Sequence, residues 1–290
     1  MRLLVKFNVI FILAFGLGLV ATGYVARGFL QRDAREQVLR QARLMMEVTG
    51  STFNYTTSQV GPIIEAHQKH MKMFFPQSIP AYSAGQIFAY VRTRYPEYTY
   101  KAATLNPTNL ADRAVDWESD VISTFRNDAR RTELVGQRAT ATGESLYLAN
   151  PIRTDATCLG CHSTPAAAPA TMVQMYGPDH GFGWRVGEIV GAQIVSVPMS
   201  VPLAIADAGF RNLMLWLAGI SVGTLILLNL ALIFTVIRPV TRMSAAADAI
   251  SKGELDVPEL PVRGSDEIAR LAAAFNRMHR SLGKAMALLG

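Results

Sequence analysis

The sequence predicts an α+β domain between two membrane-spanning helices, followed by a pair of short helices. Three features predict this: two long apolar runs, a mixed helical and alternating region between them, and heptad spacing after the second run. Of the 290 residues, 50% are hydrophobic and 17% are charged, which suits lipid-buried segments combined with a soluble core. The net charge of +6 comes from scattered basic residues, so we expect no nucleic-acid partner. The expected segments are an N-terminal stretch 1–6, a membrane helix 7–29, an outer domain 30–209, a second membrane helix 210–237 and a helix pair 238–290.

The first apolar run extends from Phe7 to Ala26 and is preceded by Arg2 and Lys6. As a helix it covers about 30 Å, which is the thickness of a bilayer's hydrocarbon core. A cleaved signal peptide is the alternative, but its apolar part is normally about 7–15 residues long and ends in a small-x-small cleavage site. Because this run is longer and no such site follows it, we expect an uncleaved anchor.

The second apolar run extends from about Leu213 to Ile237 and is followed by Arg238 and Arg242. Its Asn229 could hydrogen-bond to another membrane helix or to local groups, and the sequence leaves both open. Basic residues flanking membrane helices stay on the cytoplasmic side, so both termini are expected in the cytoplasm and residues 30–209 in the periplasm. The sequence thus predicts a two-pass protein of the bacterial inner membrane.

Both cysteines of the chain lie in one motif, Cys158-Leu159-Gly160-Cys161-His162. Two thiols three positions apart can form thioether bonds with the two vinyl groups of one haem, and the next histidine can bind its iron. The motif therefore predicts one covalent haem c, with Cys158 and Cys161 as the attachment points and His162 as the proximal iron ligand. The predicted periplasmic side is also the compartment in which c-type attachment occurs.

Two other kinds of site use similar residues. A zinc site would need a fourth ligand besides Cys158, Cys161 and His162, and adjacent cysteine and histidine ligands fit one tetrahedral ion poorly. A redox dithiol is expected in a thioredoxin-like βαβ context, which the sequence does not show. Cysteines this close in sequence also exclude a disulfide framework, so the haem interpretation is preferred.

The sixth iron ligand is open. His67 and His70 are three positions apart and would share one face of a helix, so either is a candidate distal ligand. The iron can equally be five-coordinate, which leaves a position for a gas. Other sulfur- or nitrogen-bearing side chains near these histidines or after the haem motif are Met71, Met73, Met172, Met175 and His180.

Helical and alternating patterns predict the elements of the outer domain. A helix from Gln31 to about Val60 continues out of the first membrane run. Pro165 to Pro169 is expected to form a loop at the haem edge, and Gly181 to Trp184 a tight turn in which Trp184 has a packing role. The other predicted elements are helices 81–95 and 116–128, the latter capped by Asp116, and strands 98–104, 145–150 and 188–197.

The outer domain contains the motifs Asn106–Asn109, Trp117–Glu118, Pro151–Ile152, Cys158–Ser163, Gly181–Trp184 and Val190–Gln193. Together they resemble the PAS-like c-type haem sensor domain of bacterial sensor kinases and chemoreceptors, over roughly residues 48–198. The resemblance implies a single haem held by Cys158, Cys161 and His162, and a role in redox or gas sensing. Some members use a cysteine thiolate as the distal ligand, but this chain has no further cysteine.

Two heptad patterns follow the second membrane run, separated by a connector containing Pro258 and Pro261. Two short helices of one chain cannot bury both apolar seams, whereas four helices from two chains can, which predicts a homodimer. A generic amphipathic helix pair is the alternative to a dedicated relay domain. The seam positions are Val240, Met243, Ala247 and Ile250 in the first helix and Ile268, Leu271, Phe275, Met278 and Leu282 in the second.

The same segment contains, in order, Pro239, Gly253-x-Leu255, Asp266–Ile268, Leu271 and Phe275-Asn276-x-Met278. This order is similar to that of the HAMP signal-relay domain and covers residues 236–282. The resemblance implies a parallel homodimer whose helices have two packing states, as signalling requires.

The sequence thus predicts a sensory membrane subunit and no enzymatic activity. A change in haem redox state or gas binding would bias the helix pair, and a separate cytoplasmic kinase, chemoreceptor or cyclase would respond. A separate partner is expected because the chain stops at Gly290, eight residues after Leu282; a truncated kinase gene is the alternative. The rival functions are a membrane-anchored monohaem cytochrome that carries electrons and a haem-free small-ligand sensor.

Overall fold

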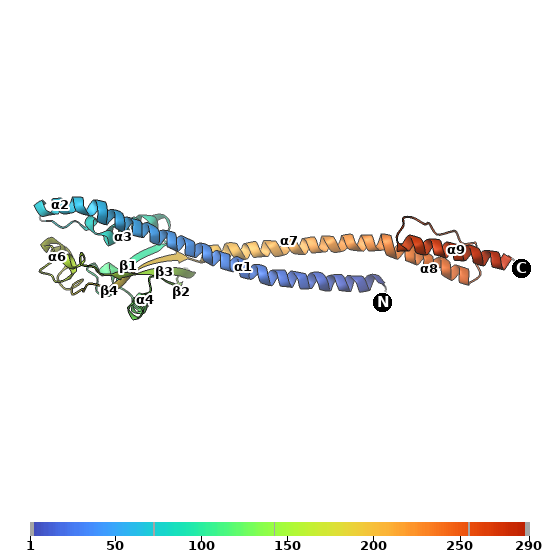
Figure 1. Cartoon of the computed structure of the whole chain (residues 1–290), viewed down its shortest axis with the longest axis horizontal. Helices are drawn as coiled ribbons and strands as arrows, with labels where there is room; N and C mark the ends of the chain where they lie inside the picture. Colours follow the sequence, from blue (N-terminus) through green and yellow to red (C-terminus); the bar gives the residue numbers. More distant parts are fainter. Residues whose placement is uncertain (1–2, 72, 142, 255, 288–290) are drawn as a thin grey trace. The chain divides into compact units, whose positions relative to one another are not determined.

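The chain forms two structural units. Residues 28–208 form one, and residues 1–27 with 209–290 form the other (Figure 1). The computed structural model describes residues 3–71, 73–141, 143–254 and 256–287, and leaves the side chains of residues 3, 68–71 and 287 undescribed.

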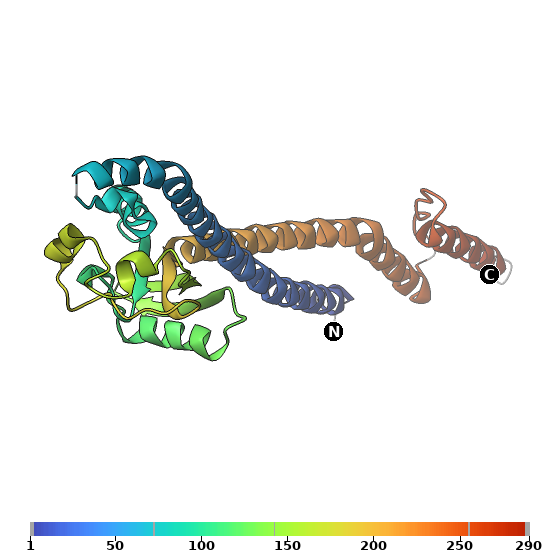
Figure 2. The ribbon, with the colours of Figure 1, turned by 60° about the vertical axis from the view of Figure 1, so that its left-hand side comes forward.

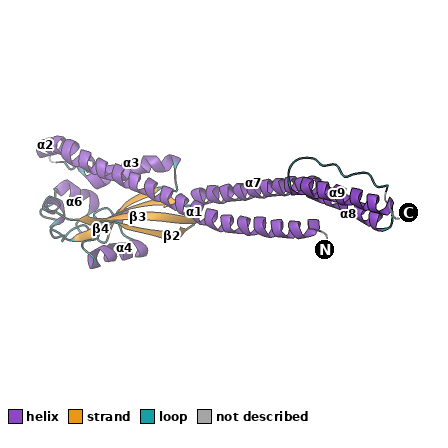
Figure 3. Ribbon diagram, turned by 45° about the vertical axis from the view of Figure 1, so that its right-hand side comes forward, coloured by secondary structure: helices purple, strands orange, loops and turns teal. Residues whose placement is uncertain are grey.

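A four-stranded antiparallel sheet forms the centre of the unit of residues 28–208 (Figure 3). Its strand order is β1-β4-β3-β2, so the last strand in sequence lies in the interior, between β1 and β3. The hairpin of β2 and β3 pairs Leu134 with Ala149 and Thr140 with Gly143. The strands are β1 (Thr99–Thr104), β2 (Leu134–Thr140), β3 (Gly143–Arg153) and β4 (Ile189–Pro198).

Three of the four strands were predicted. The segments 98–104, 145–150 and 188–197 correspond to β1, β3 and β4, and β3 is longer than expected at both ends. The edge strand β2 was missed, because its inward positions do not form an apolar pattern. At Gly136 the space for a side chain is taken by Tyr147 of β3, whose ring carbon would lie 2.3 Å from an added Cβ.

The helix α1 (Leu3–Tyr55) covers one face of the sheet (Figures 1 and 2). Val38, Ala42 and Met46 follow each other at intervals of four, so they lie on one side of the helix. They are buried and pack in one cluster with Val195 of β4. The predicted helix from residue 31 to about 60 is confirmed, and it is part of a longer helical run. That run continues through the π-helix η1 (Thr56–Val60) into α2 (Gly61–Met71).

The helix α4 (Asp116–Asn127) covers the opposite face of the sheet (Figure 1). Its fully buried Phe125 belongs to a second apolar cluster with residues of β1, β3 and β4. The predicted helix 116–128 is confirmed, but Asp116 is not its N-cap. The N-cap is Val115, whose N–H donates a hydrogen bond to the Glu118 carboxylate at 3.0 Å. Asp116 is instead the first helical residue.

Shorter elements complete this unit. The predicted helix 81–95 is α3 (Pro80–Arg94), and Pro165 to Pro169 is a loop as expected. The helix α6 was not predicted, because its seven residues are too few to show a helical period. The short elements are η2 (Pro76–Ser78), η3 (Leu110–Asp112), α5 (Leu159–His162) and α6 (Ala170–Tyr176).

The second unit contains two helices that are long and apolar enough to cross a membrane. They are the first part of α1 and α7 (Ser200–Leu232), and both predicted apolar runs are helical. Large apolar side chains such as Leu17 and Trp216 are 74% exposed, which suits contact with lipid rather than a soluble core. Arg2, which contributes to the predicted orientation, lies outside the described residues.

Two asparagines join these helices within the second unit. The side-chain amides of Asn8 and Asn229 donate hydrogen bonds to each other's oxygen, both at 2.8 Å. Each amide also donates to a backbone carbonyl four residues earlier, at Leu4 and Leu225, at 2.9 Å. Both alternatives that the sequence left open for Asn229 are therefore present together.

Replacing Asn229 by leucine is expected to weaken the association of the two helices by about 1 kcal/mol, because Asn8 loses its partner. The double variant Asn8→Leu/Asn229→Leu is expected to recover part of this loss, since it leaves no unpaired amide. Unfolding of the full chain in mixed detergent micelles measures these free energies. If the effects of the two single variants simply add in the double variant, the pair contributes no coupling.

The helices α8 (Arg238–Ser251) and α9 (Glu267–Ala287) contact each other in the second unit (Figure 1). The buried Asn276 of α9 fixes the connector between them. Its side chain accepts a hydrogen bond from the N–H of Leu260 at 3.0 Å and donates one to the Leu260 carbonyl at 2.8 Å. The π-helix η4 (Ile233–Ile237) joins α7 to α8.

Only part of the predicted apolar seam is buried within one chain. Met243 and Ile250 are buried, whereas Leu271 and Met278 are more than half exposed. Exposed seam positions are what helices of a second chain would cover. Leu255, part of the predicted Gly253-x-Leu255 motif, lies outside the described residues.

Candidate functional site

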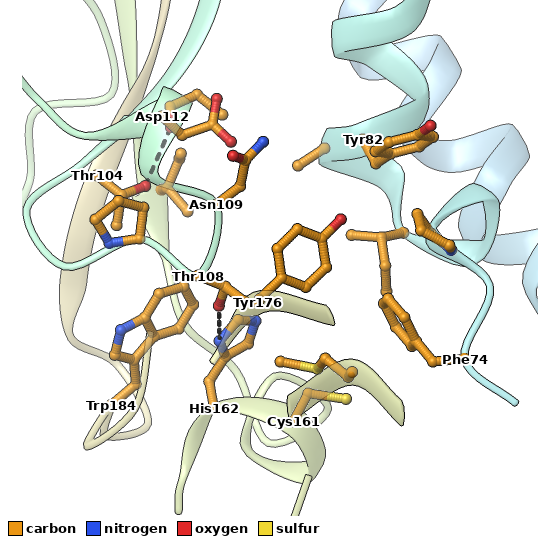
Figure 4. A pocket seen from close by; sticks show the side chains of 17 residues that line it. Phe74, Tyr82, Thr104, Thr108, Asn109, Asp112, Cys161, His162, Tyr176 and Trp184 are labelled. Carbon is orange, nitrogen blue, oxygen red and sulfur yellow. Dashed lines mark hydrogen bonds between the residues drawn. The ribbon is translucent and has the colours of Figure 1, made fainter. Parts of the chain in front are cut away.

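A cavity of about 220 Å³ lies between β1, the start of α3 and the segment that carries the Cys-x-x-Cys-His motif. Cys161 and His162 reach its wall, and Phe74, Met172 and Trp184 give it apolar surface (Figure 4). This volume is many times that of one water molecule, so the cavity can hold part of a larger ligand. Its polar side chains are Tyr82, Thr104, Thr108, Asn109, Asp112 and Tyr176.

The motif forms the single helical turn α5 (Leu159–His162), which follows a turn that starts at Asp155. The Asp155 carboxylate accepts hydrogen bonds from the N–H groups of Thr157 at 2.8 Å and Cys158 at 3.3 Å. The carbonyl of Cys158 then accepts from the N–H groups of Cys161 at 3.3 Å and His162 at 3.1 Å. Residues three apart on such a turn share one side. The fold therefore places both cysteines on one side of the turn, with Cys161 on the cavity wall.

The two cysteines are free and half-buried. Burial raises the pKa of the Cys161 thiol, and the nearby Cys158 raises it further. Burial likewise raises the pKa of Cys158, so both groups are thiols rather than thiolates at neutral pH. Thiolates are the metal-binding form, and no group of three metal-binding side chains gathers among the described residues.

The surroundings of His162 define which ring nitrogen carries its proton. Nδ1 lies 2.8 Å from the carbonyl oxygen of Gly181 and 3.3 Å from the Thr108 hydroxyl. A carbonyl can only accept, so Nδ1 donates to it and Nε2 keeps a free lone pair. Burial lowers the pKa of His162, against the opposing effect of the Gly181 hydrogen bond. The imidazole is therefore neutral at pH 7, with Nε2 available to a metal.

Two loops position the imidazole, one containing Asn106 and Thr108 and the other containing Gly181 and Trp184. Trp184 stacks on the His162 ring, with centroids 3.9 Å apart and planes 10° apart, and its backbone N–H donates to the His162 carbonyl at 3.2 Å. The Asn106 side chain connects the two loops, because it accepts a hydrogen bond from the N–H of Gly181 at 3.1 Å and donates one to the Phe182 carbonyl at 3.2 Å. The predicted packing role of Trp184 is confirmed, and its partner is the imidazole.

Gly181 allows this arrangement for two reasons. Its φ of +81° is a conformation that residues with a side chain rarely adopt. A Cβ at this position would also lie 2.0 Å from the Thr108 hydroxyl oxygen and 2.7 Å from the Thr108 Cα. The tight turn predicted at residues 181–184 is not formed: this segment is a loop with a bend at Gly181, and the hydrogen-bonded turn before β4 lies at residues 186–187. The loop brings the Gly181 carbonyl to the candidate ligand.

Comparison with known proteins identifies the two regions of the chain. Residues 31–198, more than half of the chain, match the family Tll0287-like, described as Tll0287. The chain belongs to the Tll0287-like family. Residues 231–284 match the HAMP domain. Both resemblances found in the sequence are therefore confirmed, and both matches begin before the ranges expected, 48–198 and 236–282.

Individual relatives of this Tll0287-like protein match only parts of it. The signal transduction histidine-protein kinase/phosphatase MprB of Mycolicibacterium smegmatis is 37% identical over 73 residues. These residues are 25% of this chain and 15% of that protein, so this chain spans a small part of that relative. The crystal structure of the cyanobacterial heme-protein Tll0287 matches with a TM-score of 0.35 and 19% identity, over 40% of this chain and 69% of that one.

The Tll0287-like domain does not place His67 on the cavity wall. Its side chain is exposed, and its Nδ1 lies 2.9 Å from the Ile63 carbonyl within α2. The side chain of His70 lies outside the described residues. Met172 is buried on the cavity wall, whereas Met175 is 54% exposed.

Several cavity residues had no assigned role in the sequence. Asp112, Tyr82 and Tyr176 line the cavity from three separate elements. Burial raises the pKa of the Asp112 carboxyl, against the opposing charge of Lys101. The Asn106–Asn109 motif could have indicated Thr108, since it belongs to the resemblance. Nothing in the local pattern marks the two tyrosines.

The protonation of His162 predicts a pH dependence for the haem-free protein. Its pKa is below the ordinary 6.5 in the folded state, so the unfolded chain binds more protons between the two values. The free energy of unfolding should be fully retained above pH 6.5 and fall as the pH drops through the folded pKa. Urea titrations of a Cys158→Ala/Cys161→Ala variant at several pH values test this. Adding His162→Gln to this variant should reduce the dependence of its free energy of unfolding on pH, and an unchanged dependence would contradict the assignment to His162.

Proposed function

We propose that this Tll0287-like protein is a membrane-anchored sensory subunit with one covalent haem c. The subunit detects the redox state of the haem or the binding of a diatomic gas. It relays this signal through the HAMP domain to a separate cytoplasmic protein. One observation carries the proposal. The neutral imidazole of His162 is fixed at an apolar cavity, next to Cys161, with Nε2 free.

The residues present fit a haem. Cys158 and Cys161 would form its thioether bonds, and Nε2 of His162 would bind its iron. The Gly181 carbonyl accepts from Nδ1 at 2.8 Å, as the outer partner of a metal-bound histidine does. When bound, the haem supplies an iron that changes charge on reduction and can bind a gas. Apolar side chains such as Phe74 give the cavity surface that suits a porphyrin ring. The Tll0287-like family shares its name with the cyanobacterial heme-protein Tll0287.

We propose the following topology. Helices 7–29 and 210–237 span the inner membrane, residues 30–209 are periplasmic, and residues 1–6 and 238–290 are cytoplasmic. The basic residues beside both apolar runs support this orientation. The exposed part of the α8 and α9 seam supports a homodimer, in which two chains form a four-helix HAMP bundle.

The relay can use a continuous backbone path. The loop containing Gly181 and Trp184, which contacts His162, leads directly into β4, and β4 ends at Pro198. The helix α7 begins two residues later, at Ser200. A displacement of His162 therefore acts on the strand that precedes the second membrane helix. A signal that favours one of two packing states of the bundle by a few kcal/mol is enough to shift their populations.

The electron-carrier alternative does not account for the HAMP domain, which is why we favour a sensor. Hydrogen exchange of the full chain in lipid nanodiscs, oxidised and reduced, tests the proposal. Exchange in α8 and α9 should differ between the two states, and the Cys158→Ala/Cys161→Ala variant should show no difference. Identical exchange in both states and with CO or NO, together with fast stoichiometric electron transfer to a reductase, would favour the cytochrome.

A further inference from the structure

A second cavity, of about 340 Å³, lies in the other unit, where the apolar part of the second membrane helix ends. Phe234 and Thr235 of η4 form one part of its wall. Arg242 and Met243 of α8 form another, and Arg263 comes from the connector. The start of α9 closes the remaining side. The cavity wall therefore contains both apolar side chains and two arginines.

The positive charge of this wall is not neutralised. Neither Arg242 nor Arg263 forms an ion pair with any residue that the structure describes. Asp266 is the only acidic residue of the wall, and its carboxylate caps α9 by accepting from the N–H of Ala269 at 2.8 Å. Two arginines against one engaged carboxylate leave a net charge that favours an anion.

The position along the chain indicates which anion can reach this cavity. Arg242 follows Ile237, the last residue of the apolar run, by five residues, or about 7.5 Å of helix. The headgroup layer beyond the hydrocarbon core is about 5–7 Å thick on each side. The Arg242 backbone therefore lies at the outer edge of the headgroup layer, from which its long side chain can reach the phosphates, while Phe234 and Thr235 lie at the edge of the hydrocarbon.

We propose that this cavity binds the headgroup of an anionic phospholipid, with Arg242 and Arg263 contacting its phosphate and Phe234 contacting its acyl chains. If the arginines only fixed the topology of the chain, no cavity would be needed. Arg263 would not be needed either, because it belongs to the connector and not to the segment that flanks the membrane helix. Arg238 has another role, because its guanidinium lies 4.4 Å above the Phe234 ring. The bound lipid joins α8 to the connector, so the proposal stands independently of the haem.

Native mass spectrometry of the full chain, released from nanodiscs of phosphatidylglycerol and phosphatidylcholine, tests the proposal. The chain should retain phosphatidylglycerol in preference to phosphatidylcholine. An arginine at an anionic membrane surface contributes about a fivefold gain in binding, so Arg242→Gln/Arg263→Gln should weaken retention about 30-fold. Arg263→Gln alone, which changes no helix, should weaken it about fivefold.

The matched control is Arg270→Gln/Arg277→Gln, which removes the same charge from exposed positions of α9 outside the cavity wall. It should retain the lipid as the unmodified chain does. Equal retention of both lipids, or equal loss in the control, would overturn the proposal. Excess inorganic phosphate should not displace the lipid, because it lacks the acyl contacts. Displacement by phosphate would instead show a site for free anions and overturn the assignment to a lipid.

Discussion

His162→Ala is expected to abolish proximal imidazole ligation of the iron in any haem that remains attached through Cys158 and Cys161. The side chain removed is the only histidine that lines the described cavity, and its Nε2 is the nitrogen left free by the hydrogen bond to Gly181. Optical and electron paramagnetic resonance spectra of the purified full chain should lose the signature of the proximal histidine. Added imidazole should restore much of that signature, because it can occupy the space of the deleted ring.

The matched control is His67→Ala, which removes an exposed imidazole outside the cavity. Its spectra should equal those of the unmodified chain. Unchanged spectra in His162→Ala would contradict the proximal role, whatever the control shows.

Gly181→Ala is expected to reduce the free energy of unfolding by about 2–3 kcal/mol, through strain at positive φ and a clash with Thr108. A Cβ would lie 2.0 Å from the Thr108 oxygen, so the loop around residue 181 must shift. This shift moves the carbonyl of residue 181 away from His162. Loss of this hydrogen bond makes the imidazole a weaker donor, so the midpoint potential of the haem should rise. Denaturant titration and a spectroscopic redox titration measure the two effects.

Gly183→Ala separates the clash from the backbone strain. Gly183 has nearly the same φ, +82°, but nothing lies within 4 Å of its added Cβ. Gly183→Ala should therefore reduce the free energy of unfolding by about 1 kcal/mol through backbone strain, with no change in the midpoint potential of the haem. Equal changes in potential for both variants would refute the role of the Gly181 carbonyl.

Long periodic features of the fold could be predicted from the sequence. Each of these features repeats one sequence pattern over several helical turns, so the pattern can be recognised without knowing the tertiary contacts. They are the two apolar runs, the helix α1 and the helices α8 and α9. The strand β2 and the helix α6 are short, and their formation depends on partners elsewhere in the chain. At Gly136 the partner is the Tyr147 ring, which no local pattern reveals.

The candidate site likewise has a part that the sequence predicts and a part that only the tertiary structure reveals. Cys158, Cys161 and His162 are adjacent in sequence, and their spacing alone predicts their chemistry. The groups that orient His162 come from Thr108, 54 residues before it, and Gly181, 19 residues after it. Only the folded sheet brings these loops together. The spacing of His67 and His70 predicts a shared helix face, but it does not determine which way that face points.

The most direct measurement is the intact mass and visible spectrum of the full chain produced with a c-type haem maturation system. The account predicts one porphyrin adduct on each denatured polypeptide, with the bands of haem c. The adduct should be absent from Cys158→Ala/Cys161→Ala. A colourless protein of unmodified mass, made under conditions in which a control cytochrome c matures, would contradict the account.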